Sequence, residues 1–176
     1  MILGAILAGG KSRRFGSDKA VALVDGRPLL DHVAAALGAQ SDALIVCGRD
    51  WAGMTGVSDR PAPDQGPLGG LCAALHHARA HGFDTVLTAG CDILPLPANL
   101  PALLGAASVV VAGQPLIGLW RADLADRLDH HLAAPTDRSM RGWIAASGAR
   151  TIVLDTIFHN FNTPDDLAAF TQDRAA

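Results

Sequence analysis

A cluster of cationic side chains follows the first apolar segment of the chain. The stretch LAGGKSRRFGSDK, residues 7–19, places three glycines and four cations within thirteen residues. Glycines let backbone N–H groups approach an anion closely, and lysine and arginine neutralise phosphate charge. The stretch therefore predicts a loop that binds a triphosphate, with a surface turn of solvated cations as the alternative. Its cations are Lys11, Arg13, Arg14 and Lys19.

Two well-known phosphate-binding motifs do not fit this loop. A P-loop requires a glycine where Ala5 stands, inside the apolar segment. A GxGxxG dinucleotide motif requires a glycine where Lys11 stands. The sequence therefore does not favour a P-loop NTPase or a dinucleotide-binding dehydrogenase.

Acidic residues stand in two further loops. Asp92, in CDILPLP, follows the apolar run 85–89, and a carboxylate at a rigid strand end can hold Mg²⁺ beside substrate phosphates. The alternative role for Asp92 is to cap the turn before Pro95. Asp64, in DQGPLGG, stands beside glycine and proline, a setting typical of a turn residue. It is a candidate site residue only because its loop is expected to lie beside the other two loops.

The histidines do not predict a zinc site. His77 and His81 are one helical turn apart, but no third ligand has an obvious spacing. We interpret both histidine clusters as solvated helix faces: His76, His77 and His81, and His130 and His131. No serine stands in a GxSxG motif, and we interpret Cys91, at a buried strand end, as structural rather than nucleophilic.

Composition limits the class of protein. The 176 residues are 49% hydrophobic and carry a net charge of −3, which suits one domain, residues 1–176, without a nucleic-acid or membrane surface. The apolar run precedes the cations, the reverse order of a secretory signal, and it is too short to span a bilayer. Three cysteines without CxxC spacing argue against a disulfide framework. The expected location is the cytoplasm.

Apolar runs and turn signals alternate along the chain. Short apolar runs predict strands at residues 2–7, 42–47, 85–89, 108–112, 116–120 and 151–154. Helices are predicted to start at Pro28, to span residues 71–80, to follow the stripe Leu124, Leu128 and Leu132, and to start after a cap at Thr163. The expected fold is a three-layer α/β/α sandwich with a Rossmann-like, mostly parallel sheet. Its carboxyl edge would gather the three loops into one candidate site.

The loops resemble, in the same order, four motifs of the molybdenum cofactor guanylyltransferases, a family of the nucleotidyltransferase superfamily. LAGGKSRRFGSDK is similar to LAGGxSxRMGxDK, DQGPLGG to an acidic residue followed by GPLxG, and CDILPLP to CDxPxLP. FHNFNTPDDL, residues 158–167, is similar to FxNxNTPEDL. The motifs extend from residue 7 to residue 167, and the resemblance implies an α/β fold of the nucleotide-diphospho-sugar transferase type.

The resemblance implies an enzyme that transfers GMP from GTP to molybdenum-molybdopterin and forms molybdopterin guanine dinucleotide and pyrophosphate. Such a displacement at the α-phosphorus depends on positioning and charge neutralisation and needs no covalent enzyme intermediate. Mg²⁺ is the expected cofactor. GTP and molybdopterin are the expected partners, with molybdoenzyme maturation chaperones as further candidates, and a monomer is the default.

The resemblance also assigns roles to individual residues. It implies that Lys19 holds phosphate, that Asp92 binds Mg²⁺, and that Lys11, Arg13 and Arg14 stabilise the leaving pyrophosphate; the catalytic set is Lys19, Asp92 and Arg14. The implied nucleotide-binding set is Leu7, Ala8, Gly9, Gly10, Lys11, Ser12, Arg13, Lys19, Asp64 and Asp92, with backbone contacts to guanine from Leu7, Ala8 and Gly9. The implied pterin-binding set is Asn160, Asn162, Arg138 and Arg141, and ordinary helix-surface cations are the alternative for the two arginines.

The choice of GTP as the nucleotide rests on Gly10. The resemblance associates LAGG with guanine, whereas LAAG is common in cytidylyl- and uridylyltransferases of this fold. Arg49 stands in VCGR, where the family often has an asparagine after the second strand, so one nucleoside contact stays unassigned. The alternatives are a molybdopterin cytidylyltransferase, another small-substrate nucleotidyltransferase, or a non-catalytic module that senses GTP or docks onto a chaperone.

Overall fold

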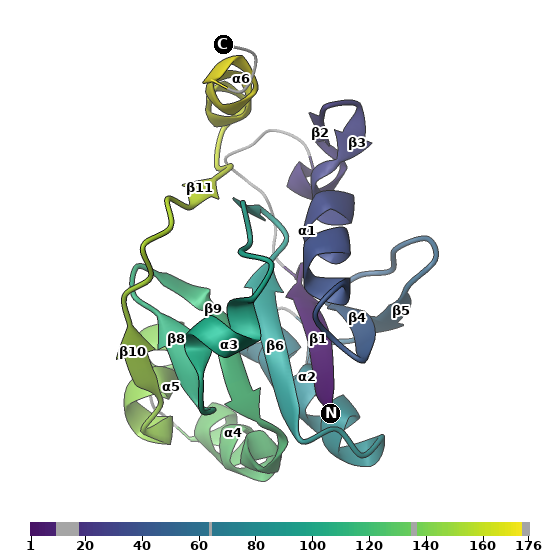
Figure 1. Ribbon diagram of the computed structural model, residues 1–176. Coiled ribbons are helices and arrows are strands. Elements are labelled where there is room, and N and C mark those ends of the chain that lie inside the picture. Colours follow the sequence, from purple (N-terminus) through teal and green to yellow (C-terminus); the bar gives the residue numbers. More distant parts are fainter. Residues whose placement is uncertain (10–17, 64, 135–136, 174–176) are drawn as a thin grey trace.

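A seven-stranded sheet forms the centre of the structure, a computed structural model that describes residues 1–9, 18–63, 65–134 and 137–173 (Figure 1). From one edge to the other, the strands are β10 (Arg150–Ile152), β8 (Val109–Val111), β9 (Gln114–Arg121), β6 (Thr85–Gly90), β1 (Ile2–Leu7), β4 (Ala43–Cys47) and β5 (Thr55–Val57). β9 is antiparallel to its neighbours β6 and β8, and the other adjacent pairs are parallel.

Helices cover both faces of the sheet. α1 (Leu29–Gly38) and α3 (Leu100–Leu104) pack on one face, and α2 (Pro67–Ala80), α4 (Ala125–Ala133) and α5 (Met140–Ser147) pack on the other. Figure 1 shows α6 (Pro164–Asp173) beyond the carboxyl ends of β1 and β6. The predicted three-layer α/β/α sandwich with a mostly parallel sheet is confirmed. Among the residues that the structure describes, none of the helices has the length and hydrophobicity of a membrane-spanning segment.

Smaller elements lie at the carboxyl edge of the sheet. They are the helical turn η1 (Lys19–Val21), the hairpin of β2 (Leu23–Val24) with β3 (Arg27–Pro28), and the antiparallel pair of β7 (Ile93–Leu94) with β11 (His159–Asn160). A second helical turn, η2 (Ala122–Leu124), leads into α4. The pair of β7 and β11 brings the C-terminal segment back to the end of β6.

Side-chain alternation along the strands builds one core on each face. On β1, Leu3, Ala5 and Leu7 pack into the core under α2, whereas Ile6 packs into the core under α1. All four are at most 6% exposed. Because successive strand residues point to opposite faces, a strand covered on both faces is apolar at every position. This is why the central strands were predictable as short continuous apolar runs.

The structure corrects two predicted helix starts. α2 begins at Pro67 rather than at residue 71. The first turn was not predicted because it contains two glycines, which have a low helix propensity. The glycines let this turn pack tightly on the sheet, since a Cβ added to Gly70 would lie 3.2 Å from the Cβ of Cys47. Pro28 precedes α1 and pairs with Leu23 in the β2–β3 hairpin, so it does not start the helix as predicted.

A buried hydroxyl joins β6 to β9. Thr88 has no exposed surface; its hydroxyl accepts a hydrogen bond from Trp120 Nε1 at 3.2 Å and donates one to the Gly118 carbonyl oxygen at 3.3 Å. We expect Thr88→Val to lower the free energy of unfolding by about 1–3 kcal/mol, because the buried Trp120 N–H loses its acceptor. Urea unfolding measures this loss.

Thr88→Ser is the matched control, since it keeps the hydroxyl and removes one methyl group. Its loss of stability should be the smaller of the two. A Thr88→Val protein at least as stable as the Thr88→Ser protein would contradict the expected role of the hydrogen bond.

Candidate functional site

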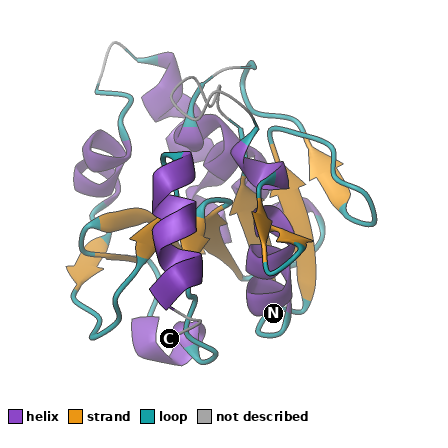
Figure 2. Cartoon of the chain, turned by 90° about the horizontal axis from the view of Figure 1, so that it is seen from above, coloured by secondary structure: helices purple, strands orange, loops and turns teal. Residues whose placement is uncertain are grey.

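Lys19 joins three chain segments at the carboxyl edge of the sheet, the edge that Figure 2 views from above. Its Nζ lies 3.1 Å from Asp92 Oδ2 and donates a hydrogen bond to Asn162 Oδ1 at 2.9 Å. The Lys19 side chain is 14% exposed and that of Asp92 is 23% exposed. A pair so far withdrawn from water is screened less than a surface pair. Lys19, Asp92 and Asn162, here called the Lys19 group, were all predicted as site residues, and the structure brings them together.

The C-terminal segment reaches this group through a short antiparallel pair. β11 pairs with β7, the strand that follows Asp92. The backbone N–H of Phe161 then donates to the carbonyl oxygen of Asp92 at 3.0 Å, and the buried Phe161 ring packs edge-on against Phe170. These contacts place Asn162 beside Lys19 although 143 positions separate the two residues in the chain.

The cap of α6 orients the backbone at Asn162. The Asp166 carboxylate accepts hydrogen bonds from the backbone N–H groups of Asn162 and Thr163, both at 2.8 Å. The Thr163 hydroxyl accepts one from the Asp166 N–H at 3.2 Å. This reciprocal capping box confirms the helix start that the sequence predicted. The hydrogen bonds from Asn162 and Thr163 hold the pKa of Asp166 below its usual value.

Arg49 fixes the start of η1 from the loop after β4. Its guanidinium donates two hydrogen bonds to the Asp18 carboxylate, one of them at 2.8 Å, and lies 5.4 Å from the centroid of the Trp51 ring. Asp18 also accepts a hydrogen bond from the Ala20 N–H at 3.1 Å and so caps η1, which begins with Lys19. The hydrogen bond from Arg49 holds the pKa of Asp18 below its usual value and raises the pKa of Arg49 itself.

Arg49 was noted in the sequence only as a departure from the family pattern. The structure makes it a positioning residue for Lys19, because it holds the cap on the turn that carries the lysine. No spacing rule could have found this pair, since Arg49 and Asp18 lie 31 positions apart on two different loops.

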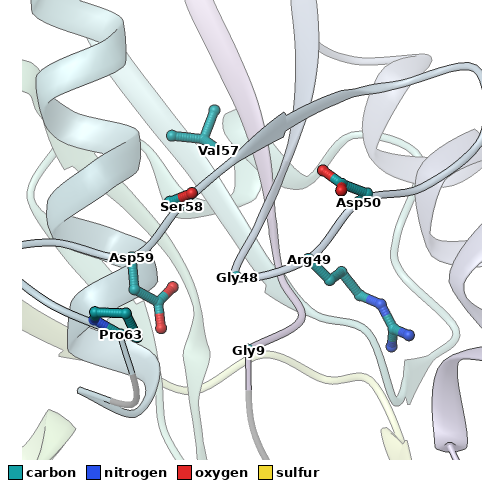
Figure 3. Close-up of a pocket in the computed structure, with 8 residues that line it drawn as sticks. All are labelled: Gly9, Gly48, Arg49, Asp50, Val57, Ser58, Asp59 and Pro63. Carbon is teal, nitrogen blue, oxygen red and sulfur yellow. The ribbon is translucent and has the colours of Figure 1, made fainter.

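A cleft of about 260 Å³ opens between the loops that follow β1, β4 and β5 (Figure 3). Its lining residues are Gly9, Gly48, Arg49, Asp50, Val57, Ser58, Asp59 and Pro63. Pockets that hold whole small-molecule ligands usually measure about 300–1,000 Å³, so this cleft suits one part of a nucleotide, such as its base and ribose. Figure 3 shows Asp59 on one side of Gly48 and Arg49 and Asp50 on the other.

Two glycines allow the floor of this cleft to form. A Cβ added to Gly48 would lie 2.5 Å from Gly9 Cα, and Gly48 has a φ of +83°, which favours glycine. A Cβ added to Gly9 would lie 3.1 Å from Asp59 Oδ2. The backbones of two loops and a carboxylate are therefore in close contact. Asp59 was missed by the sequence analysis, because its only signal was one aspartate before a proline-rich turn.

The other predicted site residues that the structure describes lie outside the Lys19 group and differ in their exposure. Leu7 and Ala8 are buried at the end of β1, and the Ala8 N–H already donates to the Cys47 carbonyl oxygen, whereas Gly9 lines the cleft. Asn160 is exposed on β11. Arg138, just before α5, and Arg141, in its first turn, are exposed, and Figure 1 shows α5 at the opposite end of the sheet from α6. The predicted residues Gly10, Lys11, Ser12, Arg13, Arg14 and Asp64 lie outside the described residues.

Asp92 fits a divalent cation such as Mg²⁺. Magnesium prefers oxygen ligands and usually takes one or two protein carboxylates together with substrate phosphates and water. In the part of the chain that the structure describes, Asp92 belongs to no group of three histidine, cysteine or acidic ligands. An ion at Asp92 would therefore share its coordination with substrate oxygens rather than lie in a protein cage.

One interpretation of the histidines is wrong. His76 does not lie on a solvated helix face: its side chain is 16% exposed, and its Nε2 lies 2.6 Å from Asp129 Oδ2 on α4. His77 and His81 stack near the end of α2, with 4.0 Å between their ring centroids.

Burial raises the pKa of the Cys91 thiol to about 12, so this thiol stays protonated at neutral pH and is a poor nucleophile.

The chain is similar to known proteins along most of its length. Residues 4–151 match the family model of the MobA-like NTP transferase domain. The chain is 38% identical over 182 residues to the molybdenum cofactor guanylyltransferase of Cereibacter sphaeroides, an alignment that covers 95% of this chain and 94% of that one. Its fold matches the crystal structure of molybdopterin-guanine dinucleotide biosynthesis protein A from Archaeoglobus fulgidus, with a TM-score of 0.75, 19% identity and 99% of each chain covered. It also matches a Mycobacterium tuberculosis protein in complex with manganese, with a TM-score of 0.63, 17% identity, and 97% of this chain and 98% of that one covered.

We expect Gly48→Ala to weaken binding of a guanine nucleotide. The added Cβ would force Gly48 and Gly9 apart and so open the floor of the cleft. Isothermal titration should show binding weaker by about tenfold or more, equivalent to about 1.4 kcal/mol.

Gly53→Ala is the matched control for this change. Gly53 has a φ of +79°, so alanine meets the same backbone strain there, but nothing lies within 4 Å of the added Cβ. Equal nucleotide affinity in the two variants would show that binding does not need the close approach of the two loops.

Proposed function

The chain belongs to the molybdenum cofactor guanylyltransferases, within the MobA-like NTP transferase domain family, and we propose that its site transfers GMP from GTP to molybdenum-molybdopterin. The products are molybdopterin guanine dinucleotide and pyrophosphate. The contact of Lys19 with Asp92 and Asn162 is the observation that carries this proposal. It joins a cation for phosphate, a carboxylate for a metal ion and an amide for the acceptor at one edge of the sheet.

The cleft is the proposed site of the guanosine moiety. Its floor is the backbone of Gly9 and Gly48, which a flat ring can approach closely. The Asp59 carboxylate borders this floor and can accept hydrogen bonds from the ring or from ribose hydroxyls. Guanine offers a ring N–H beside its amino group, whereas cytosine offers an amino group alone. Guanine therefore offers more N–H donors than cytosine to an Asp59 oxygen at this floor, which supports GTP as the substrate.

The proposed reaction is a displacement at the α-phosphorus of GTP. An oxygen of the molybdopterin phosphate forms the new bond to phosphorus while the bond to pyrophosphate breaks, and no bond to the protein forms. Lys19 neutralises phosphate charge, and its contacts with Asp92 and Asn162 hold it in place before substrate arrives. In phosphoryl transfer, positioning and charge stabilisation of this kind account for most of the rate enhancement.

Asp92 is the proposed holder of Mg²⁺. A bound magnesium ion supplies charge neutralisation and orientation for the phosphates. The fold relative from Mycobacterium tuberculosis was crystallised with manganese, and Mg²⁺ and Mn²⁺ both favour oxygen ligands. The carboxylate of Asp92 is a ligand that suits either ion.

The remaining predicted residues complete the proposal. Asn160 and Asn162 contact the pterin, and Arg138 and Arg141 are candidates for its phosphate. The loop residues Gly10, Lys11, Ser12, Arg13, Arg14 and Asp64 contact the nucleotide. The chain, one domain over residues 1–176, acts as a monomer in the cytoplasm, where its three free cysteines suit a reducing compartment. Molybdoenzyme maturation chaperones are further candidate partners.

Release of pyrophosphate with Mg²⁺ and molybdenum-molybdopterin, measured with GTP, CTP, UTP and ATP in turn, tests this function. We expect turnover with GTP alone. Asp92→Ala should lower turnover about 100-fold or more, the usual effect of removing one charge-stabilising group. Asp123→Ala is the matched control, because its carboxylate forms an exposed ion pair with Arg121 and its loss should leave turnover unchanged.

Each other outcome corrects the proposal in its own way. Turnover with CTP would identify a cytidylyltransferase. Binding of GTP without turnover would identify a non-catalytic module or a different acceptor. Full activity of a folded Asp92→Ala protein would remove Asp92 from the reaction.

A further inference from the structure

A second polar cluster forms between α2 and α4, on helices rather than on the loops of the Lys19 group. Cys72 and His76 stand one helical turn apart on α2, and Asp129 faces them from α4. One potential ligand atom from each side chain lies within 4.8 Å of the other two. No other set of three such side chains occurs among the described residues.

The three side chains already contact one another. The Cys72 thiol donates a hydrogen bond to Asp129 Oδ1 at 3.1 Å, and His76 Nε2 lies 2.6 Å from Asp129 Oδ2. Cys72 is fully buried, whereas His76 and Asp129 keep 16% and 31% of their side-chain surface exposed. The core therefore closes the cluster on one side, and an ion can reach it from solvent on the other.

The chemistry of this set matches a transition metal. Thiolate, imidazole and carboxylate are the ligands of Zn²⁺ in proteins, at about 2.0–2.3 Å from the ion. Ligand atoms at those distances in a tetrahedron are about 3.3–3.8 Å apart. Side chains whose ligand atoms lie within 4.8 Å of one another therefore need only small rotations to surround one ion.

We propose that Cys72, His76 and Asp129 form a Zn²⁺ site whose fourth position is open to water. The thiolate and the carboxylate balance the two positive charges, so the loaded site is neutral. The ion would link α2 to α4. This site is separate from the proposed nucleotidyl transfer and takes no part in it.

Binding releases the thiol proton and moves the proton that His76 shares with Asp129. In the metal-free protein, burial and the hydrogen bond to Asp129 raise the pKa of the Cys72 thiol to about 12. Zinc binds the thiolate, so the S–H bond breaks and the proton leaves to solvent as the sulfur–zinc bond forms. His76 binds through a ring nitrogen without a proton, so the proton between Nε2 and Asp129 moves to Nδ1 or leaves to solvent, and no oxidation or reduction occurs.

Arg60 is one positive charge that opposes a cation at this place, and Arg79, paired with Asp126, is another nearby. Arg60 Nη2 lies 3.8 Å from Asp129 Oδ2, and the Arg60 side chain is 50% exposed. A half-exposed ion pair of this kind contributes little to stability, so a metal ion can displace the guanidinium toward solvent. Arg60 therefore offers a variant that should strengthen metal binding rather than abolish it.

Titration of the untagged chain with Co²⁺, a spectroscopic substitute for Zn²⁺, tests the site. We expect a thiolate-to-Co²⁺ charge-transfer band and the strong visible bands of tetrahedral Co²⁺, and Zn²⁺ should remove both. Cys72→Ser, His76→Gln and Asp129→Asn should each weaken Co²⁺ binding by about tenfold or more. Even the loss of a residue that only orients a metal ligand usually costs about tenfold in affinity. Arg60→Ala should bind Co²⁺ more tightly than the wild-type protein.

His77→Gln is the matched control, because His77 neighbours His76 on α2 and stacks on His81 outside the cluster. It should leave both bands unchanged. Since Cys72 is buried, circular dichroism must confirm that its variant folds, and the His76 and Arg60 variants repeat the test at more exposed positions.

Two results would overturn the proposal. One is a folded wild-type protein that shows no thiolate charge-transfer band. The other is a band that His77→Gln removes and His76→Gln does not. Because the readout is a spectrum rather than pyrophosphate release, failure here is distinguishable from failure of the proposed function.

Discussion

The candidate site depends on the contacts of the Lys19 ammonium group with Asp92 and Asn162. The ammonium group draws together the start of η1, the end of the central strand β6 and the segment before α6. A lysine that is 14% exposed needs such partners, because an unpaired charge withdrawn from water costs several kcal/mol. The pairing of β11 with β7, the cap of α6 and the hydrogen bonds of Arg49 to Asp18 each keep one part of this arrangement in place. The site is therefore organised before a substrate binds.

The same contacts let the free protein balance its own charges. Lys19 is paired with Asp92, and Arg49 is paired with Asp18 on the next loop. In the proposed reaction, a phosphate would take the place of the carboxylate and the amide as the partner of Lys19. The lysine would then have an anionic partner both before and after substrate binds, in agreement with a nucleoside triphosphate as the proposed ligand.

α2 connects the cleft with the proposed zinc site. Its first turn packs against Asp59, since a Cβ added to Gly69 would lie 3.1 Å from Asp59 Cβ, and its middle carries Cys72 and His76. The residue after Asp59 is Arg60, whose N–H donates to the Gly69 carbonyl oxygen at 3.1 Å and whose guanidinium approaches Asp129. One loop therefore carries both the carboxylate of the cleft and the cation that competes for the cluster between α2 and α4.

Local patterns in the sequence predicted the central strands and the cap of α6, and motifs named Lys19, Asp92 and Asn162 as site residues, which the structure shows in contact. Elements with weak local patterns were missed, such as the short strand β5 and the glycine-containing first turn of α2. Three features could not be predicted from sequence patterns: Arg49 holds Asp18, Asp59 borders the cleft, and His76 meets Asp129. These residues lie far apart along the chain. Local patterns report which faces of a helix or strand are buried, whereas a contact such as the one between Cys72 and Asp129, 57 positions apart, depends on how two folded helices pack.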